Sequence, residues 1–256
     1  MAIVVNTSED LQRLLTTLAN ELVDANVYLR LHGDLGLAVS MFSREFNQAR
    51  AFWGLTLQAH QDAAIFRLCK IYDQRRDSVN LKSLLETIKA NQHFFSEPNF
   101  RSRLQGNPAV DSLALESRVP DPIQLSADIS YVSKATNPKV KTLVELRNAL
   151  YAHRASKDVL NATDLAASYP LTTADAHDLL ACGMEIVNRY CQLFHAHTYS
   201  TQVIGHSDYK TVIEALRWDL ARRDDEIQRA SIRADIVSAW DEVEKRKLRA
   251  NDETES

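Results

Sequence analysis

The residues best suited to chemistry in this chain are an arginine, an asparagine and a histidine on one predicted helix, at residues 141–157. The apolar positions that recur at helical spacing there are Val140, Leu143, Leu150 and Tyr151. At about 100° per residue, Arg147 lies about 40° from Leu143, on the apolar face. Because a guanidinium keeps its charge, on a buried face it must contact an anion or line a wet cleft.

The other two residues are Asn148, which follows Arg147 directly, and His153, six positions after the arginine. On an α-helix the side chains of Arg147 and His153 diverge by about 120°. A single helix is therefore a poor frame for a catalytic pair. Two copies packed antiparallel about a two-fold axis would bring two arginines and two histidines into one cleft, so the spacing favours a homodimer.

Positive charge gathers around the same helix. Six basic residues stand against Glu145 and Asp158, a local charge of +4 in a chain whose formal net charge is −4. The six are Lys134, Lys139, Lys141, Arg147, Arg154 and Lys157. A phosphate-bearing ligand suits such a patch, whereas the net charge of the whole chain gives no general attraction to nucleic acid or anionic membranes.

Composition predicts an all-α fold. Apolar residues make up 45% of the 256 residues, and only six glycines and six prolines are present. Few turns are therefore available, and long helices follow. The cysteines Cys69, Cys182 and Cys191 form neither a metal-type pair nor a disulfide framework, which indicates a reducing compartment. No basic leader or apolar run of about 20 residues is present, so we expect a cytoplasmic protein without membrane contact.

The periodicity places the elements that must position the helix of Arg147. We expect a helix from Ser8 to about residue 31, interrupted by Gly33 and Gly36, then helical sequence over 37–71 with a break near 46–50. Residues 52–72 are apolar almost all round and predict a central, buried helix. Further helices are expected at 81–88, 123–135, 138–157 and 172–198, with a loop-rich crossover at 93–122 that has room for one short helix.

The last part of the chain predicts a separate element. We divide the chain into a helical domain at 1–205 and a charged helical arm with a frayed tail, from about residue 249, at 206–256. Apolar residues of the arm follow heptad-like spacing, which favours docking onto the domain or pairing between protomers over capture of another protein. The positions are Tyr209, Ile213, Leu216, Leu220, Ile227, Ala230, Ala234 and Val237.

Three sequence segments together resemble the HEPN superfamily, and within it the abortive-infection U-type (AbiU-like) branch. They are the apolar helix that ends Ile-Tyr-Asp at residue 73, the following Val-Asn-Leu-Lys-Ser-Leu-Leu, and Leu-Arg-Asn-Ala-Leu-Tyr-Ala-His at 146–153. The resemblance spans about residues 10–200 and leaves the C-terminal arm unexplained. It implies a HEPN-like helical bundle and metal-independent RNA cleavage at a homodimer interface, commonly in phage defence or toxin modules.

The resemblance also implies roles for the three residues. Arg147 would bind and orient the scissile phosphate, Asn148 would help to orient it, and His153 would act as general acid or base. We add two sets of candidates. Lys141, Arg154 and Lys157 are candidates for RNA or phosphate binding, and Tyr72, Asp73 and Tyr151 for support of the site. RNA, a second copy, and an antitoxin or other defence-system protein are the expected partners; neither a metal nor a cofactor is expected.

Other interpretations stay open. Arg147 would have a purely structural role if it paired with a buried carboxylate such as Asp73, with His153 capping the helix C-terminus. The chain would then be a catalytically inactive module that binds RNA, a nucleotide or a partner protein, or an assembly protein that uses residues 208–249. Metal binding by His195 and His197 is disfavoured, because residues two apart lie on different sides of a helix.

Overall fold

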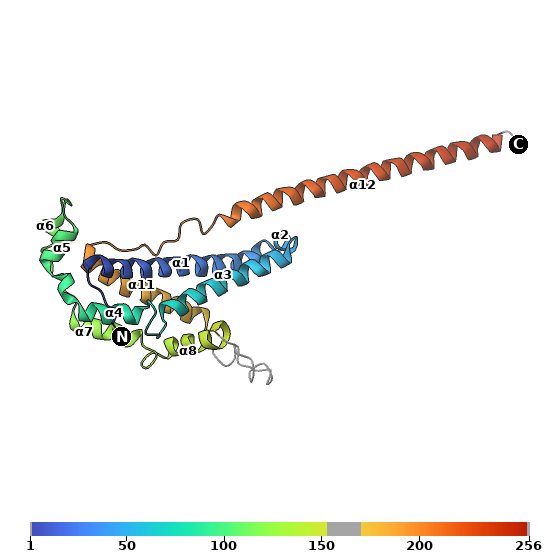
Figure 1. Ribbon diagram of the computed structural model, residues 1–256. Coiled ribbons are helices and arrows are strands. Elements are labelled where there is room, and N and C mark those ends of the chain that lie inside the picture. Colours follow the sequence, from blue (N-terminus) through green and yellow to red (C-terminus); the bar gives the residue numbers. More distant parts are fainter. Residues whose placement is uncertain (1, 153–169, 255–256) are drawn as a thin grey trace. The chain divides into compact units, whose positions relative to one another are not determined.

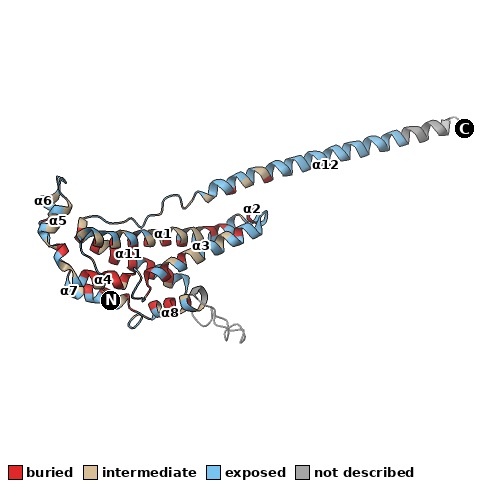
Figure 2. Ribbon diagram, viewed as in Figure 1, coloured by how far each residue is buried: buried red, intermediate tan, exposed pale blue. Residues whose placement is uncertain are grey.

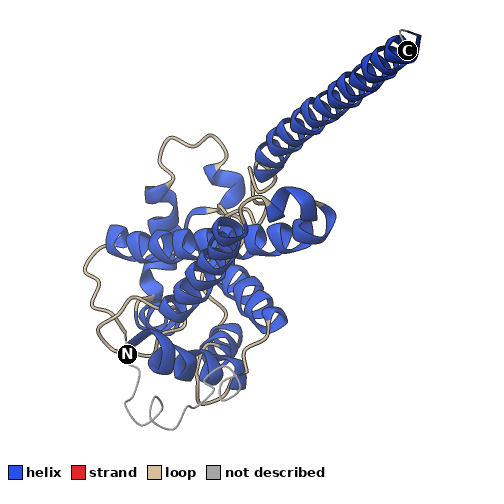
Figure 3. Cartoon of the chain, turned by 90° about the vertical axis from the view of Figure 1, so that its right-hand side faces the viewer, coloured by secondary structure: helices blue, strands red, loops and turns tan. Residues whose placement is uncertain are grey.

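The computed structural model describes residues 2–152 and 170–254, with the side chains of residues 2–149 and 170–245. Every regular element within these ranges is a helix, which confirms the predicted all-α class (Figure 3). Within the same ranges, no helix combines the length and the apolar character that crossing a membrane requires.

The helices follow one another along the chain as drawn in Figure 1. They are α1 (Ser8–Met41), α2 (Ser43–Asn47), α3 (Arg50–Ile71), α4 (Leu81–Ala90), the 3₁₀-helix η1 (Gln92–Phe95), α5 (Glu97–Arg103), α6 (Val110–Leu113), α7 (Pro122–Tyr131), α8 (Pro138–Leu146), the π-helix η2 (Arg147–Ala152), α11 (Thr173–His195) and α12 (Tyr209–Thr254). They form two compact units. The first comprises Met1–Gly36 and Gly54–His206, and the second comprises Leu37–Trp53 and Ser207–Ser256. The division at residue 205 stays a prediction.

Side-chain caps determine where the main helices begin. At the start of α4, Asn80 Oδ1 accepts a hydrogen bond from the Ser83 amide at 2.8 Å, and Ser83 Oγ accepts one from the Asn80 amide at 3.0 Å. Thr172 and Asp175 form the same reciprocal box at the start of α11. Each box satisfies two amides that the helix itself leaves unpaired, so both starts follow from short local sequences.

Buried apolar side chains of α1, α3, α4, α8 and α11 form the core of the first unit. Buried residues are red along the ribbon in Figure 2. Each fully buried leucine contributes about 1.5–3 kcal/mol to stability relative to an exposed one. At Gly183, α11 comes so close that an added Cβ would lie 3.0 Å from Leu22 Cδ2 and 3.2 Å from the Tyr72 hydroxyl. The packing therefore fixes Tyr72, at the end of α3, against α1 and α11.

The predicted interruption of the first helix at Gly33 and Gly36 is wrong, because α1 continues through both to Met41. A glycine inside a helix costs about 1 kcal/mol relative to alanine. The neighbouring Leu29 and Leu35 are buried, at 3% and 2% exposure, and their burial offsets that cost. The expected break near residues 46–50 is confirmed, since α2 ends at Asn47 and α3 begins at Arg50.

The prediction of a central, buried helix over residues 52–72 is correct for only part of its surface. Ala64, Leu68 and Ile71 are buried, whereas Phe52 and Leu55 are 60% and 72% exposed. Apolar composition shows that several sides of a helix are able to pack, but neighbouring elements decide which of them do. The N-terminal turns of α3 therefore carry exposed apolar side chains.

Two other segments are more helical than predicted. The crossover at 93–122 contains α5 and α6 in addition to most of η1, because Pro98 lies in the first turn of α5, where a missing amide N–H costs nothing. The tail expected to fray from residue 249 continues α12 to Thr254. Each added residue of an existing helix gains one hydrogen bond, which favours this continuation.

The second unit is built where α12 begins. Ile213 and Leu220 are buried, and Arg217 Nε donates to the buried Glu45 carboxylate of α2 at 3.0 Å. The Arg217 guanidinium also lies 5.0 Å from the centre of the Phe42 ring. Docking is thus observed for the first turns of the arm. From residue 221 to residue 245 every side chain of α12 is exposed.

Candidate functional site

Arg147 is positioned by α8, whose start and buried face are both encoded locally. Asn137 Oδ1 accepts a hydrogen bond from the Lys139 amide at 3.0 Å, and Pro138 occupies the first turn, as the sequence predicts. Val140 and Leu143 are fully buried. This packing fixes the rotation of α8, and Arg147 follows directly after its last residue.

The predicted α-helix over 141–157 does not continue past Leu146, because Arg147–Ala152 forms the π-helix η2. A π-helix closes its hydrogen bonds over five residues instead of four and therefore turns less per residue. The offset of about 120° between Arg147 and His153 assumed α geometry and does not apply to this turn. His153 itself lies outside the described residues. Such π-turns are frequent at functional sites.

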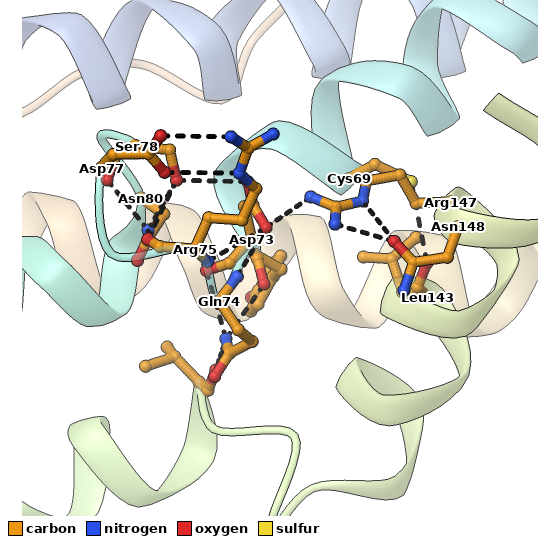
Figure 4. A network of polar contacts seen from close by, with 12 residues as sticks. Cys69, Asp73, Gln74, Arg75, Asp77, Ser78, Asn80, Leu143, Arg147 and Asn148 are labelled. Atoms are coloured by element: carbon orange, nitrogen blue, oxygen red, sulfur yellow. Dashed lines mark hydrogen bonds and ion pairs between the residues drawn. The ribbon is translucent and has the colours of Figure 1, made fainter. Parts of the chain in front are cut away.

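The Arg147 guanidinium is held by two acceptors (Figure 4). Nη1 donates to Asp73 Oδ1, while Nη2 and Nε donate to Asn148 Oδ1 at 2.8 Å and 3.2 Å. The Arg147 side chain is 20% exposed and that of Asp73 is 9% exposed. A purely structural role for Arg147 requires a buried carboxylate as its partner, and Asp73 provides one. Three of the five guanidinium N–H groups are engaged in this network.

Asp73 is itself fixed by the loop that follows α3. Its Oδ1 accepts hydrogen bonds from the amides of Gln74 at 2.7 Å and Arg75 at 3.2 Å, and its Oδ2 accepts one from the Ser78 hydroxyl at 3.1 Å. Aspartate side chains commonly bond the following backbone amides in this way. The carboxylate is thus oriented independently of Arg147, and it presents a preformed acceptor to the guanidinium.

The neighbouring Cys69 has a structural role. Its thiol donates to the Leu143 carbonyl at 3.8 Å and so joins α3 to α8. Burial raises the pKa of the Cys69 thiol to about 12, with the positive charge of Arg147 acting in the opposite direction. The thiol therefore stays protonated at neutral pH and does not serve as a nucleophile.

The two tyrosines named as supporting residues are placed differently. Tyr72 is fully buried, and its hydroxyl donates to the Leu179 carbonyl of α11 at 2.7 Å. Burial raises the pKa of Tyr72 well above its usual value. Tyr72 therefore anchors the end of α3, directly before Asp73. The backbone of Tyr151 belongs to η2, but its side chain lies outside the described part of the chain.

Part of the predicted basic patch is neutralised, because Lys139 pairs with carboxylates of another helix. Lys139 Nζ lies 2.6 Å from Asp178 Oδ2 and 2.9 Å from Asp175 Oδ1, both on α11, and these carboxylates raise the pKa of Lys139. Lys141 is exposed, with Nζ 3.9 Å from Glu145 Oε1 on its own helix. Counting charges along one helix misses carboxylates supplied by another. Arg154 and Lys157 lie outside the described residues.

The structure thus brings Asp73, Arg147 and Asn148 into one network, and Tyr72 directly precedes Asp73 in the chain. The loop residues that hold Asp73 had not been singled out, although the segment Asp-Gln-Arg-Arg-Asp-Ser-Val-Asn at 73–80 is rich in turn-forming side chains. Gln74 adds a further link, because its Nε2 donates to the Val132 carbonyl beyond α7 at 3.1 Å. The residue types of this loop predict a turn, but they do not show which distant groups the loop contacts.

A second cluster lies at the end of α11. The helix ends at His195, and Ala196 adopts a left-handed conformation with φ of 54°. The chain therefore reverses, and the rings of His195 and His197 stack with centroids 3.6 Å apart, so their predicted separation on different sides of a helix is wrong. Among the side chains that the structure describes, no group of three or more His, Cys, Asp or Glu is placed to hold a metal ion.

Comparison with known proteins identifies one family. No curated protein and no solved structure matches the chain. The family model described as AbiU2, of the HEPN type, matches residues 8–215. The match includes the loop of Asp73, helix α8 and the turn of Arg147, and it ends in the first turns of α12. This helical chain therefore belongs to the AbiU2 family of HEPN domains, a family associated with abortive infection and defence.

Proposed function

We propose that the chain is an endoribonuclease that cleaves RNA without a metal, as part of a defence or toxin module, in a cleft shared by two copies. The observation that carries the proposal is the Arg147 guanidinium. It is four-fifths buried, it is oriented by Asp73 and Asn148, and it lies on a π-turn in a chain of the HEPN AbiU2 family. An oriented cation of this kind suits the binding of a phosphodiester.

The proposed reaction is transfer of the scissile phosphodiester to the neighbouring ribose 2′-hydroxyl. A base takes the 2′-proton while the oxygen attacks phosphorus, and an acid gives a proton to the departing 5′-oxygen. The products are a 2′,3′-cyclic phosphate and a 5′-hydroxyl, so atoms and charge balance. Two histidines are suited to these opposite roles, and a two-fold cleft would supply one His153 from each copy.

In this scheme Arg147 stabilises the charge that develops on the non-bridging phosphate oxygens. Its remaining N–H groups would bind those oxygens, and Asn148, which is exposed, would orient the phosphate or its neighbours. Asp73 would be a positioning residue, because it contacts the guanidinium and is held by the Gln74 and Arg75 amides. Lys141, Arg154 and Lys157 would contribute attraction for the RNA backbone.

The test uses the purified full-length protein and RNA in excess EDTA. Arg147→Ala and His153→Ala are expected to reduce cleavage by about 10²–10³-fold each, as loss of a group that stabilises or transfers charge does in other enzymes. Arg189→Ala is the matched control, since Arg189 also pairs with a buried carboxylate, Asp128, at 2.6 Å. Wild-type activity in both site variants would remove Arg147 and His153 from the mechanism.

A second function, binding without catalysis, is favoured by one observation. The positive charges of Arg147 and Lys139 are each countered by carboxylates, as in a site that has lost its reaction and keeps its architecture. In that case the wild type would bind RNA without cutting it. Arg147→Ala would weaken binding and lower the slope of log K against log salt by about one.

The shared cleft and the partner proteins have tests of their own. Light scattering on the purified chain is expected to give the mass of a dimer, and a monomer at working concentration would contradict the two-fold arrangement. Co-expression with neighbouring genes, followed by copurification, would identify an antitoxin or other defence-system partner. Residues 221–245 of α12, which have exposed side chains, are the segment that we propose for such a contact.

A further inference from the structure

We propose that a cavity beside Asp73 receives one nucleobase of the RNA, next to the phosphate assigned to Arg147. The cavity has a volume of about 260 Å³ and lies between α1, the end of α3 and the loop before α4. The inference deepens the proposed function, on which it rests, by adding a base-selective subsite. All residues that line the cavity belong to the first unit of the structure.

The walls of the cavity suit a flat heteroaromatic ring. Apolar atoms make up the larger part of the lining, to which the exposed Val79 of the loop contributes, while the buried Leu18 of α1 and Ile71 of α3 lie beneath it. Pockets that hold whole drug-sized ligands measure about 300–1,000 Å³ and are mostly apolar, with a few polar groups that set orientation. A cavity slightly below that range has room for a single ring system, with the sugar and phosphate left outside.

The polar groups of the lining stand where the edge of a base needs partners. Thr17 and Ser78 contribute hydroxyls, and Lys70 and Glu21 contribute a donor and an acceptor that pair with each other. Hydrogen-bond donors and acceptors are therefore both present in the lining. A site of this composition distinguishes bases by the hydrogen bonds that the wrong base leaves unmade.

The link to Arg147 is the Asp73 side chain, which lines the cavity and also accepts the Arg147 hydrogen bond. Figure 4 shows Ser78, another lining residue, and Arg147 contacting the same carboxylate from different sides. A base in the cavity and a phosphate on Arg147 would thus be separated by one side chain. This arrangement corresponds to neighbouring parts of one nucleotide.

The loop that forms one wall is rigidly held before any ligand arrives. Asn80 Nδ2 donates to the Ser78 carbonyl at 3.0 Å and to the Arg75 carbonyl at 3.2 Å. Asp73 accepts from the amides of Gln74 and Arg75. A wall that is ordered in advance lowers the entropic cost of binding, and so favours selectivity for a small ligand.

The test blocks the cavity from an exposed position of α1. Four oligoribonucleotides that differ only in the base beside the cleaved bond are compared by kcat/KM. Wild type is expected to prefer one base by about 10- to 100-fold, and Thr17→Trp is expected to remove most of that preference. Asn20→Trp is the matched control, because Asn20 is exposed on the same helix and does not line the cavity. Val79→Trp repeats the block from the loop.

The outcomes separate this inference from the proposed function. If wild type cleaves all four substrates equally, the subsite is wrong and the ribonuclease proposal stands. If nothing is cleaved, the four nucleoside 5′-monophosphates are titrated against the protein by calorimetry. Binding of one of them, lost in Thr17→Trp and kept in Asn20→Trp, supports the subsite while the nuclease fails. Binding of none overturns the subsite.

Discussion

The Arg147 guanidinium and the Asp73 carboxylate join two segments that lie 74 positions apart, the turn after α8 and the end of α3. Both side chains are mostly buried, so each needs the other. Removing one partner of such a pair typically costs about 3–5 kcal/mol, because an uncompensated charge stays behind. The pair therefore stabilises the fold and orients the guanidinium with the same contact, and variants must be chosen to separate these effects.

Asp73→Asn tests the orienting role, with kinetics measured at a temperature where the variant is folded. The amide keeps an acceptor oxygen for the loop amides but removes the negative charge beside Arg147. We expect tighter RNA binding, because a repulsive charge is lost, and a kcat lower by about 10²-fold, because the guanidinium is held less precisely. Single-turnover kinetics measure both. Asp128→Asn, at another Arg–Asp pair with a buried carboxylate, is the control, and an unchanged kcat in Asp73→Asn would contradict the positioning role.

The close approach at Gly183 predicts the effect of an added methyl group. Gly183→Ala is expected to destabilise the fold by about 1–3 kcal/mol, because the new Cβ would lie 3.0 Å from Leu22 and press on the Tyr72 hydroxyl. Gly33→Ala is the opposite case. A Cβ added at Gly33, within α1, meets no neighbouring group within 4 Å, so the free energy of unfolding is expected to rise by about 0.5–1 kcal/mol. Urea unfolding measures both, and two changes of the same sign would contradict the packing.

The buried imidazole at the end of α11 predicts a pH dependence of stability. Burial, with a contribution from His197, lowers the pKa of His195 to about 4. The unfolded chain takes up this proton near its ordinary pKa of about 6.5, whereas the folded chain does so only near pH 4, so stability falls as pH decreases between these values. The melting temperature of His195→Phe should therefore decline less than that of wild type from about pH 7 to about pH 4.5.

Exposed His177 provides the control for that experiment, since His177→Phe also exchanges an imidazole for an aromatic ring. Parallel decline of wild type and His195→Phe over the same pH range would contradict the assignment to His195.

The left-handed conformation of Ala196 predicts a stabilising substitution. The left-handed conformation destabilises a residue with a Cβ by about 1–2 kcal/mol, whereas glycine adopts it at almost no cost. Ala196→Gly is therefore expected to raise the free energy of unfolding by about 1 kcal/mol, because φ of 54° at a helix C-terminus suits glycine. Chemical denaturation checks this, and a loss of stability would show that Ala196 has a packing role that outweighs its strain.

Local signals in the sequence predict much of this structure. The cap at Asn137–Pro138, the apolar face of α8 and the carboxylate available at Asp73 are all evident from residue types and spacing. These features depend on neighbours within a few positions, so short-range rules are sufficient for them. The position of Arg147 on a packed face follows from the same spacing.

The features that sequence alone misses depend on distant residues. The carboxylates that neutralise Lys139 come from α11, some 40 positions later, and no count along one helix includes them. The π-turn at Arg147 changes the angle between side chains without any glycine or proline to mark it. The exposed side of α3 is likewise decided by what packs beside it, which residue type does not reveal.

The long exposed part of α12 has a consequence for local unfolding. Residues 221–245 have no buried side chain, so their amides are protected by the hydrogen bonds of the helix alone. Most helical stability in proteins comes from tertiary packing, which this stretch lacks, so it should exchange amide hydrogens and admit proteases long before the core of α1, α4 and α11 does. A partner bound there would register first as slower hydrogen exchange over this stretch.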